Sequence, residues 1–118
     1  MNRIEQISIA GKDIFIIDYS GCKERQMVDM IVSLKEQILT FNKPVSVLSI
    51  FTTSYATPAF MQALRVAAHE VNHLLEKEVV VGLSNPKKMI LKGYNLLFNK
   101  NVQAFDTREE AMKHLFEN

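Results

Sequence analysis

The sequence has 118 residues, of which 47% are hydrophobic and 23% are charged. This size and composition predict a single globular domain over residues 1–118 and exclude a disordered chain. Lys and Arg number 14 against 13 Asp and Glu, and the formal net charge of +1 argues against nucleic-acid binding through bulk charge.

Two strands are predicted first, at residues 3–9 and 14–17. Ile7 and Ile9 share one face of the first strand, whereas the second is apolar throughout, as expected of a strand buried on both faces. Residues 10–13 favour a turn, so the two segments are expected to form an antiparallel hairpin.

A helix is predicted next, beginning near Cys22 and ending before Pro44. Its apolar residues recur every three or four positions and define one buried stripe: Met27, Met30, Ile31, Leu34, Ile38 and Phe41. A strand is predicted at residues 45–51, and a polar loop follows it.

The second helix is predicted to begin after Thr57, because a threonine N-cap followed by Pro58 is typical of a helix start. Its predicted buried face comprises Phe60, Leu64, Ala67, Ala68, Val71, Leu74 and Leu75. A short apolar strand is then predicted at residues 79–83.

A third helix is predicted to begin at residues 84–86, and its predicted inner side comprises Ile90, Tyr94 and Leu97. A last strand is predicted at residues 102–105. Thr107 and Glu110 form a capping box that opens a final helix. The order ββαβαβαβα predicts an α/β fold: a mostly parallel sheet with an N-terminal hairpin and flanking helices.

The segment from His69 to His73 reads His-Glu-Val-Asn-His and matches H-E-x-x-H, in which two imidazoles bind zinc beside a glutamate base. No carboxylate lies between Glu78 and Asp106, so the usual third ligand is missing. Both histidines also fall opposite the apolar stripe of their helix, on its predicted solvated face. A zinc hydrolase using His69, Glu70 and His73 is therefore an outside hypothesis, and no cofactor is expected.

The loop after the strand at residues 45–51 is the preferred binding site. Open α/β sheets bind ligands at the carboxyl ends of their strands, and helix N-termini favour anions. The same hydroxyls also serve in ordinary turns and caps. The candidate residues are Thr52, Thr53, Ser54, Tyr55, Thr57 and Phe60.

Residues 79–104 contain four lysines and no acidic residue. Lys87 and Lys88 stand at the start of the third helix, where the helix dipole would reinforce a contact with an anion. The stretch lacks aromatic residues placed to stack on bases, and the chain has no glycine-rich phosphate loop. Nucleic acid is therefore not expected as a partner.

The chain is expected to be cytoplasmic. Its first residues lack the apolar core of a secretory signal, and the longest charge-free stretch, residues 44–64, is broken by Pro58 and several Ser and Thr residues. No membrane span is therefore expected. The single cysteine, Cys22, excludes an internal disulfide framework and fits a reducing compartment. Its position near a helix start and two cations also favours a reactive thiolate, although a structural cysteine explains it as well.

Three segments together resemble the STAS (SpoIIAA-like) superfamily, named for sulfate transporters and anti-sigma-factor antagonists. They read DIFIIDYSG at residues 13–21, GLSNPKKMIL at residues 82–91 and VQAFDTREEAMKHL at residues 102–115. The resemblance covers the whole chain, and within the superfamily the chain looks most similar to a bacterial branch. It implies a small α/β domain without catalysis of its own, which binds partner proteins or a small ligand and is phosphorylated in some members.

In regulatory STAS members the phosphorylated Ser or Thr follows the third strand, within an Asp-Ser-(Ser/Thr)-Gly type motif. Here Thr53 and Ser54 keep hydroxyls at this place, but the preceding Asp and the following Gly are absent. This departure argues against switching by a kinase.

A non-enzymatic regulatory or protein-interaction domain of STAS type is therefore the first expectation, with its surface at residues 52–57 and the start of the second helix. The alternative is a binder of a small apolar, lipid-type or acidic ligand at the same loop, with Lys87 or Lys88 contacting an anionic group. A homodimer through a sheet edge or a helix face is also compatible with the sequence.

Overall fold

The computed structural model describes residues 3–54 and 57–117. Its five strands are β1 (Ile4–Ile9), β2 (Lys12–Asp18), β3 (Val45–Ile50), β4 (Leu75–Val81) and β5 (Gln103–Phe105). Its helices are α1 (Glu24–Phe41), α2 (Pro58–Val71), α3 (Asn85–Phe98) and α4 (Arg108–Leu115), with one 3-10 turn, η1 (Asn72–Leu74). The predicted α/β fold is confirmed, including the order of its elements.

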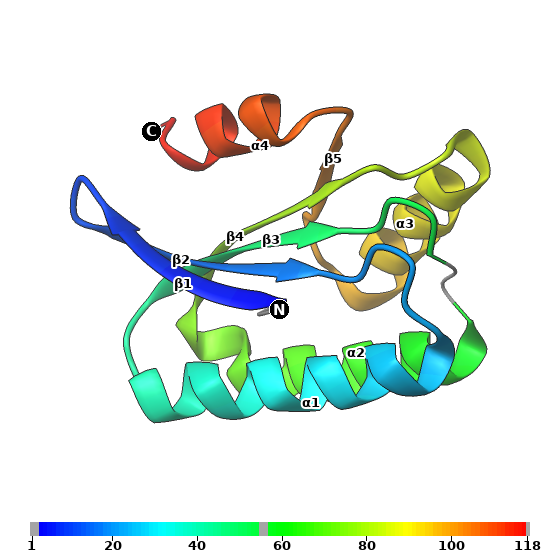
Figure 1. The fold of residues 1–118 in the computed structure, drawn as a ribbon, viewed down its shortest axis with the longest axis horizontal. Helices are drawn as coiled ribbons and strands as arrows, with labels where there is room; N and C mark the ends of the chain where they lie inside the picture. Colours follow the sequence, from blue (N-terminus) through cyan, green and yellow to red (C-terminus); the bar gives the residue numbers. More distant parts are fainter. Residues whose placement is uncertain (1–2, 55–56, 118) are drawn as a thin grey trace.

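The strands lie in the sheet in the same order as in the sequence, β1-β2-β3-β4-β5. β1 pairs antiparallel with β2, and the other three pairs are parallel. Each parallel connection therefore steps in the same direction across the sheet. Because such crossovers are right-handed, α1, α2 and α3 all cover one face, and α4, which follows the last strand, covers the other (Figure 1).

The opening hairpin turns at Ala10 and Gly11, with Ile9 paired to Lys12. Both turn residues have positive φ, +52° for Ala10 and +80° for Gly11. Two successive left-handed residues match the right-handed twist of the flanking strands, which is why such two-residue turns are favoured in hairpins. The predicted hairpin is thus confirmed.

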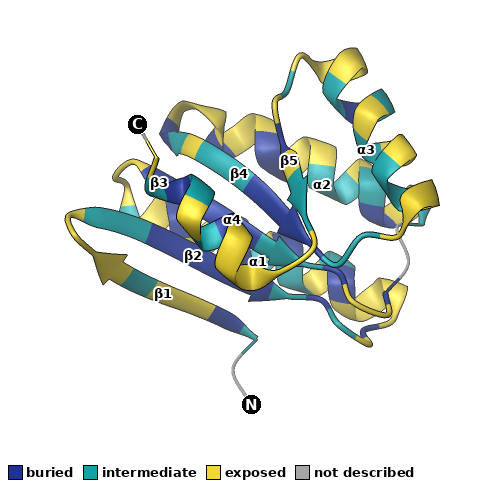
Figure 2. Cartoon of the chain, turned by 90° about the horizontal axis from the view of Figure 1, so that it is seen from above, coloured by how far each residue is buried: buried dark blue, intermediate teal, exposed yellow. Residues whose placement is uncertain are grey.

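The sheet separates two apolar cores, and its middle strands β2, β3 and β4 carry long runs of buried residues (Figure 2). Side chains alternate along β2, so that Phe15 and Ile17 pack under α1, α2 and α3, whereas Ile14 and Ile16 pack under α4. Among the described residues, no helix combines the length and the apolarity needed to cross a lipid bilayer.

The short helix α4 is held to the sheet by two lysines at its C-terminal end. The ammonium of Lys77, on β4, donates to the carbonyl oxygens of His114, at 3.0 Å, and Glu117. The ammonium of Lys12, on β2, donates to the carbonyl oxygen of Leu115 at 3.2 Å. The carbonyl oxygen of His114 also accepts from the backbone N–H of Glu117 at 3.2 Å. Because the last carbonyls of a helix lack the usual partner one turn further on, the lysines add donors where the helix itself supplies few.

Two local predictions are wrong. The second helix ends at Val71 rather than at Leu75, because Leu74 lies in the 3-10 turn and Leu75 already pairs with Val45 as the first residue of β4. On α3, Tyr94 is buried as predicted, but the other two residues of the predicted inner side are not, because Ile90 is 48% exposed and Leu97 is 80% exposed. The buried side of α3 includes Leu91 and Tyr94 instead, so the helix is rotated relative to the prediction.

Candidate functional site

The predicted loop lies at the carboxyl end of β3, and its residues have unequal access to solvent. Thr52 and Thr53 are exposed, and Thr53 has a left-handed φ of +58°. Ser54 is 1% exposed, and its hydroxyl donates to the carbonyl oxygen of Phe51 at 3.0 Å. Of the two hydroxyls that the STAS resemblance singles out, only Thr53 is accessible to another protein. Tyr55 lies outside the described residues.

Thr57 caps α2 as predicted. Its side-chain oxygen accepts from the backbone N–H of Phe60 at 3.3 Å, and Pro58 occupies the first helical position. The cap satisfies a backbone donor that the helix cannot pair itself. It therefore gives Thr57 a structural role, and the cap sets the position at which Phe60 enters the core.

The same loop packs tightly on the turn after β4. Gly82, at the end of that strand, has φ +85°, and a Cβ placed on it would lie 2.5 Å from the Thr52 Oγ1 atom and 3.1 Å from the Thr52 backbone nitrogen. Glycine is thus required here both by the backbone conformation and by the close approach of the neighbouring loop.

The two predicted lysines have different partners. The Lys87 ammonium donates to the carbonyl oxygen of Ser54, which links the start of α3 to the loop. Lys88 forms an ion pair with Asp106 at 3.0 Å, on the other side of the helix start. The structure therefore brings Lys87, but not Lys88, to the loop after β3.

Three aromatic rings gather beneath this edge of the sheet. Tyr19 stacks on Phe51, with ring centroids 4.9 Å apart, and meets the edge of Phe60 at 5.1 Å. All three side chains are buried. The Tyr19 hydroxyl has no hydrogen-bond partner among the described residues, and burial, followed by the nearby Cys22 thiol, raises its pKa well above the ordinary value.

Replacing Tyr19 with phenylalanine is expected to raise the free energy of unfolding, by up to about 1 kcal/mol. The substitution keeps the ring contacts and removes a buried hydroxyl whose hydrogen bonds to water are lost on folding. Guanidinium unfolding of both proteins measures the difference. A loss of stability instead of a gain would mean that the hydroxyl does have a partner in the folded protein.

An apolar pocket of about 80 Å³ lies between α2, α3 and the sheet. Phe60, Met61 and Leu64 line it from α2, and Ile90, Leu91 and Tyr94 from α3, with Lys87 at the start of that helix. The remaining lining residues are Val47, Ser49, Phe51, Glu78, Val79, Val80, Leu83 and Val102. Phe60 and Lys87 are thus the two predicted site residues that the fold brings into one pocket.

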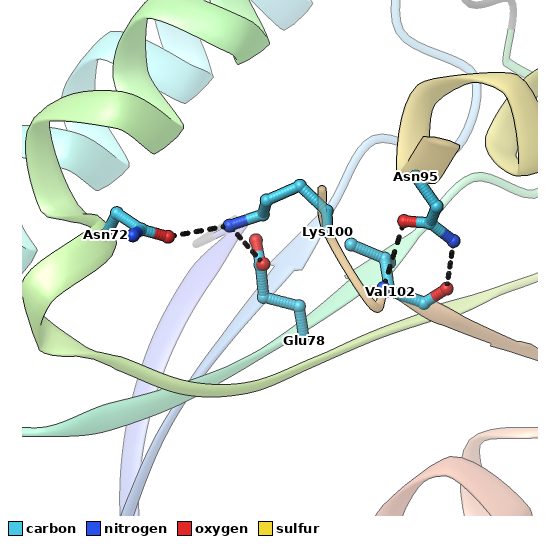
Figure 3. A network of polar contacts seen from close by, with 5 residues as sticks. All are labelled: Asn72, Glu78, Asn95, Lys100 and Val102. Carbon is cyan, nitrogen blue, oxygen red and sulfur yellow. Dashed lines mark hydrogen bonds and ion pairs between the residues drawn. The ribbon is translucent and has the colours of Figure 1, made fainter. Parts of the chain in front are cut away.

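A polar network includes two residues that line the pocket, Glu78 and Val102 (Figure 3). Lys100 forms an ion pair with Glu78 at 2.8 Å and donates to the side-chain oxygen of Asn72 at 3.0 Å. Asn95 donates to the carbonyl oxygen of Val102 at 2.9 Å and accepts from its N–H at 3.1 Å, which ties α3 to the chain just before β5. Burial, with a further contribution from Glu78, raises the pKa of Tyr94 to about 12, so this phenol stays protonated at neutral pH.

Sequence reasoning missed Glu78, Asn95 and Lys100. A signal was nevertheless present: β4 and α3 run in opposite directions, so the chain just after α3 returns beside the middle of β4, where Glu78 lies. The last acid before the lysine-rich stretch and the last lysine within it therefore meet as an ion pair.

The H-E-x-x-H residues do not converge. His69 is in the last turn of α2, whereas His73 lies beyond the α-helix in the 3-10 turn, and both are exposed. Glu70 forms an ion pair with Lys35 of α1 at 3.0 Å. Within residues 3–54 and 57–117, no three His, Cys, Asp or Glu side chains are grouped so that they could hold a metal ion. Cys22 is buried, and its thiol contacts the sulfur of Met30 at 3.8 Å.

A scan against known protein-family models finds no match for this chain, and a search of curated proteins finds no relative.

Proposed function

We propose that this chain is a non-enzymatic interaction domain of STAS type, and that it binds a partner protein by taking one of the partner's apolar side chains into the pocket between α2 and α3. The observation that carries the proposal is the pocket itself, whose lining is mostly apolar and comes from two helices and the sheet. Protein interfaces concentrate their binding energy in such pockets, each filled by one apolar or aromatic anchor residue.

The size of the pocket favours a side chain over a lipid. At about 80 Å³ it is roughly half the size of the engineered cavity of about 150 Å³ that holds benzene. A leucine or methionine side chain suits this volume, whereas a long acyl chain would require α3 to move away. Met61 and Leu64 are half-buried and Ile90 is exposed, so the pocket can be reached from solvent.

Capped amino acids test the proposal without knowledge of the partner. N-acetyl-leucinamide is expected to shift the amide NMR signals of residues around Leu64, Ile90 and Tyr94, with an affinity in the millimolar range. N-acetyl-asparaginamide, the polar control, is expected to leave them unchanged. Leu64→Trp fills the pocket from α2 and is expected to abolish the response. Leu39→Trp, on the exposed side of α1, is the matched variant that keeps it.

The second candidate function is a binder of a lipid-type ligand. It is favoured by a smaller cavity of about 40 Å³ between α1, α2 and the sheet, which shares Val47, Ser49, Leu64 and Glu78 with the main pocket. A chain-like ligand could pass beneath α2 through both. Decanoate is the probe: binding at least about tenfold tighter than that of N-acetyl-leucinamide would favour this candidate and contradict the first. No response to either probe would contradict both.

A further inference from the structure

The outward side of α3 carries four large apolar side chains. Met89 is 74% exposed, Ile90 48%, Leu96 85% and Leu97 80%. At about 100° per residue, these positions fall within a strip about 120° wide, next to the buried side of the same helix. We call these four residues and Gly93, which lies at the middle of the strip, the outer α3 face. Figure 2 shows α3 at the margin of the molecule, with exposed residues along its length.

Gly93 is not needed by the domain's own structure. Its φ lies outside the left-handed region, and a Cβ placed on it would meet no atom within 4 Å. Glycine in the middle of a helix weakens that helix relative to alanine. The missing side chain does, however, leave a notch between Met89, Ile90, Leu96 and Leu97, into which the backbone of a second helix can fit closely.

The edges of the outer α3 face are positively charged. Lys88 and Lys92 follow one edge, and Arg65 of α2 lies over the ring of Phe98 at 5.9 Å, near the end of the helix. Residues 79–104 contain no acidic residue. Lys88 is paired with Asp106, but Lys92 is exposed and has no ion-pair partner among the described residues. The face therefore matches a partner with carboxylates beside an apolar strip.

We infer that the outer α3 face binds an acidic amphipathic helix of a partner protein, which crosses α3 at Gly93. This inference rests on the proposed function in one respect: Ile90 also lines the pocket, so an apolar residue of the bound helix is placed to enter it. A second copy of this chain fits less well, because its own α3 carries no carboxylate that could meet the lysines. A membrane surface also fits less well, because a lipid bilayer has no helix backbone that would need the notch at Gly93.

A pair of labelled peptides of about five helical turns tests the inference. Both carry leucine on one face; one has glutamate along the edges of that face and the other has lysine. Fluorescence anisotropy is expected to show that the glutamate peptide binds at least about tenfold more tightly. Leu96→Asp is expected to abolish this binding. Leu39→Asp, at the corresponding position in the last turn of α1 and also exposed, is the matched control that preserves it.

Gly93→Ala separates a binding role from a structural one. The variant is expected to melt a few degrees higher, because alanine favours the helix, yet to bind the glutamate peptide several-fold more weakly, because a methyl group enters the notch. Unchanged binding by Gly93→Ala, equal binding of the two peptides, or no binding of either overturns the inference.

Binding of either of two other partners to the outer α3 face would also overturn the inference. One is a dimer that depends on Leu96, detected by sedimentation velocity. The other is Leu96-dependent flotation with phosphatidylglycerol vesicles. If the peptides fail while N-acetyl-leucinamide still binds, the inference falls and the proposed function stands.

Discussion

The variant Phe60→Ala is expected to lose about 3–5 kcal/mol of unfolding free energy, a large part of the stability of a typical domain. Phe60 is fully buried and meets the rings of Tyr19 and Phe51 at 5.1 and 5.9 Å. Alanine would leave a cavity joined to the apolar pocket and would remove both edge-to-face contacts. Guanidinium unfolding followed by circular dichroism measures the loss.

Phe98→Ala is the matched control for that variant. Phe98 also contacts another ring, that of Tyr94 at 5.1 Å, but its side chain is 43% exposed. We expect this substitution to cost less than about half as much, because less apolar surface is returned to water. Equal losses for the two variants would show that the aromatic cluster is not the main support of this edge of the sheet.

The second large effect is expected for Gly82→Ala, with a loss of about 2–4 kcal/mol. A left-handed alanine costs about 1–2 kcal/mol by itself, and crowding against Thr52 adds a packing cost of similar size. Thermal unfolding with a van't Hoff analysis gives the difference from the parent protein.

The hairpin glycine provides the control that separates these two costs. Gly11 has a similar φ of +80°, but a Cβ placed there would meet nothing within 4 Å. Gly11→Ala is therefore expected to show the conformational cost alone. If both glycine variants lose the same stability, the contact between Gly82 and Thr52 contributes nothing. Thr52→Ala in the Gly82→Ala background is expected to recover part of the loss, because it removes the crowded hydroxyl.

Elements with strong local signals could be predicted from the sequence. Thr57 with Pro58 and Thr107 with Glu110 begin their helices as predicted, since the cap hydrogen bonds involve residues only three apart. Local signals failed at Leu75, where apolar spacing continued the helical pattern although the residue belongs to a strand. They also failed at Leu97, because α3 has two apolar sides and periodicity alone does not tell which one faces the core.

The candidate site was predictable only in part. The position of the loop at the carboxyl end of β3 follows from topology, and Phe60 and Lys87 line the pocket beside it. The contact of Glu78 with Lys100 joins residues more than twenty positions apart and depends on the register of β4 with α3. The exposure of Thr53 and the burial of Ser54 depend on a single turn, which the pattern of hydroxyls does not encode.

The matching order of strands in the chain and in the sheet has a consequence for synthesis on the ribosome. Each strand after the hairpin can add to the growing edge as soon as its crossover helix has left the exit tunnel, so no strand has to wait for a distant partner. The helix α4 is the exception, because it is made after all five strands and packs over residues made much earlier, including Ile14 and Ile16 of β2. Until α4 docks, one apolar face of the sheet is exposed to solvent. During this interval the nascent domain is most prone to aggregate and most in need of a chaperone.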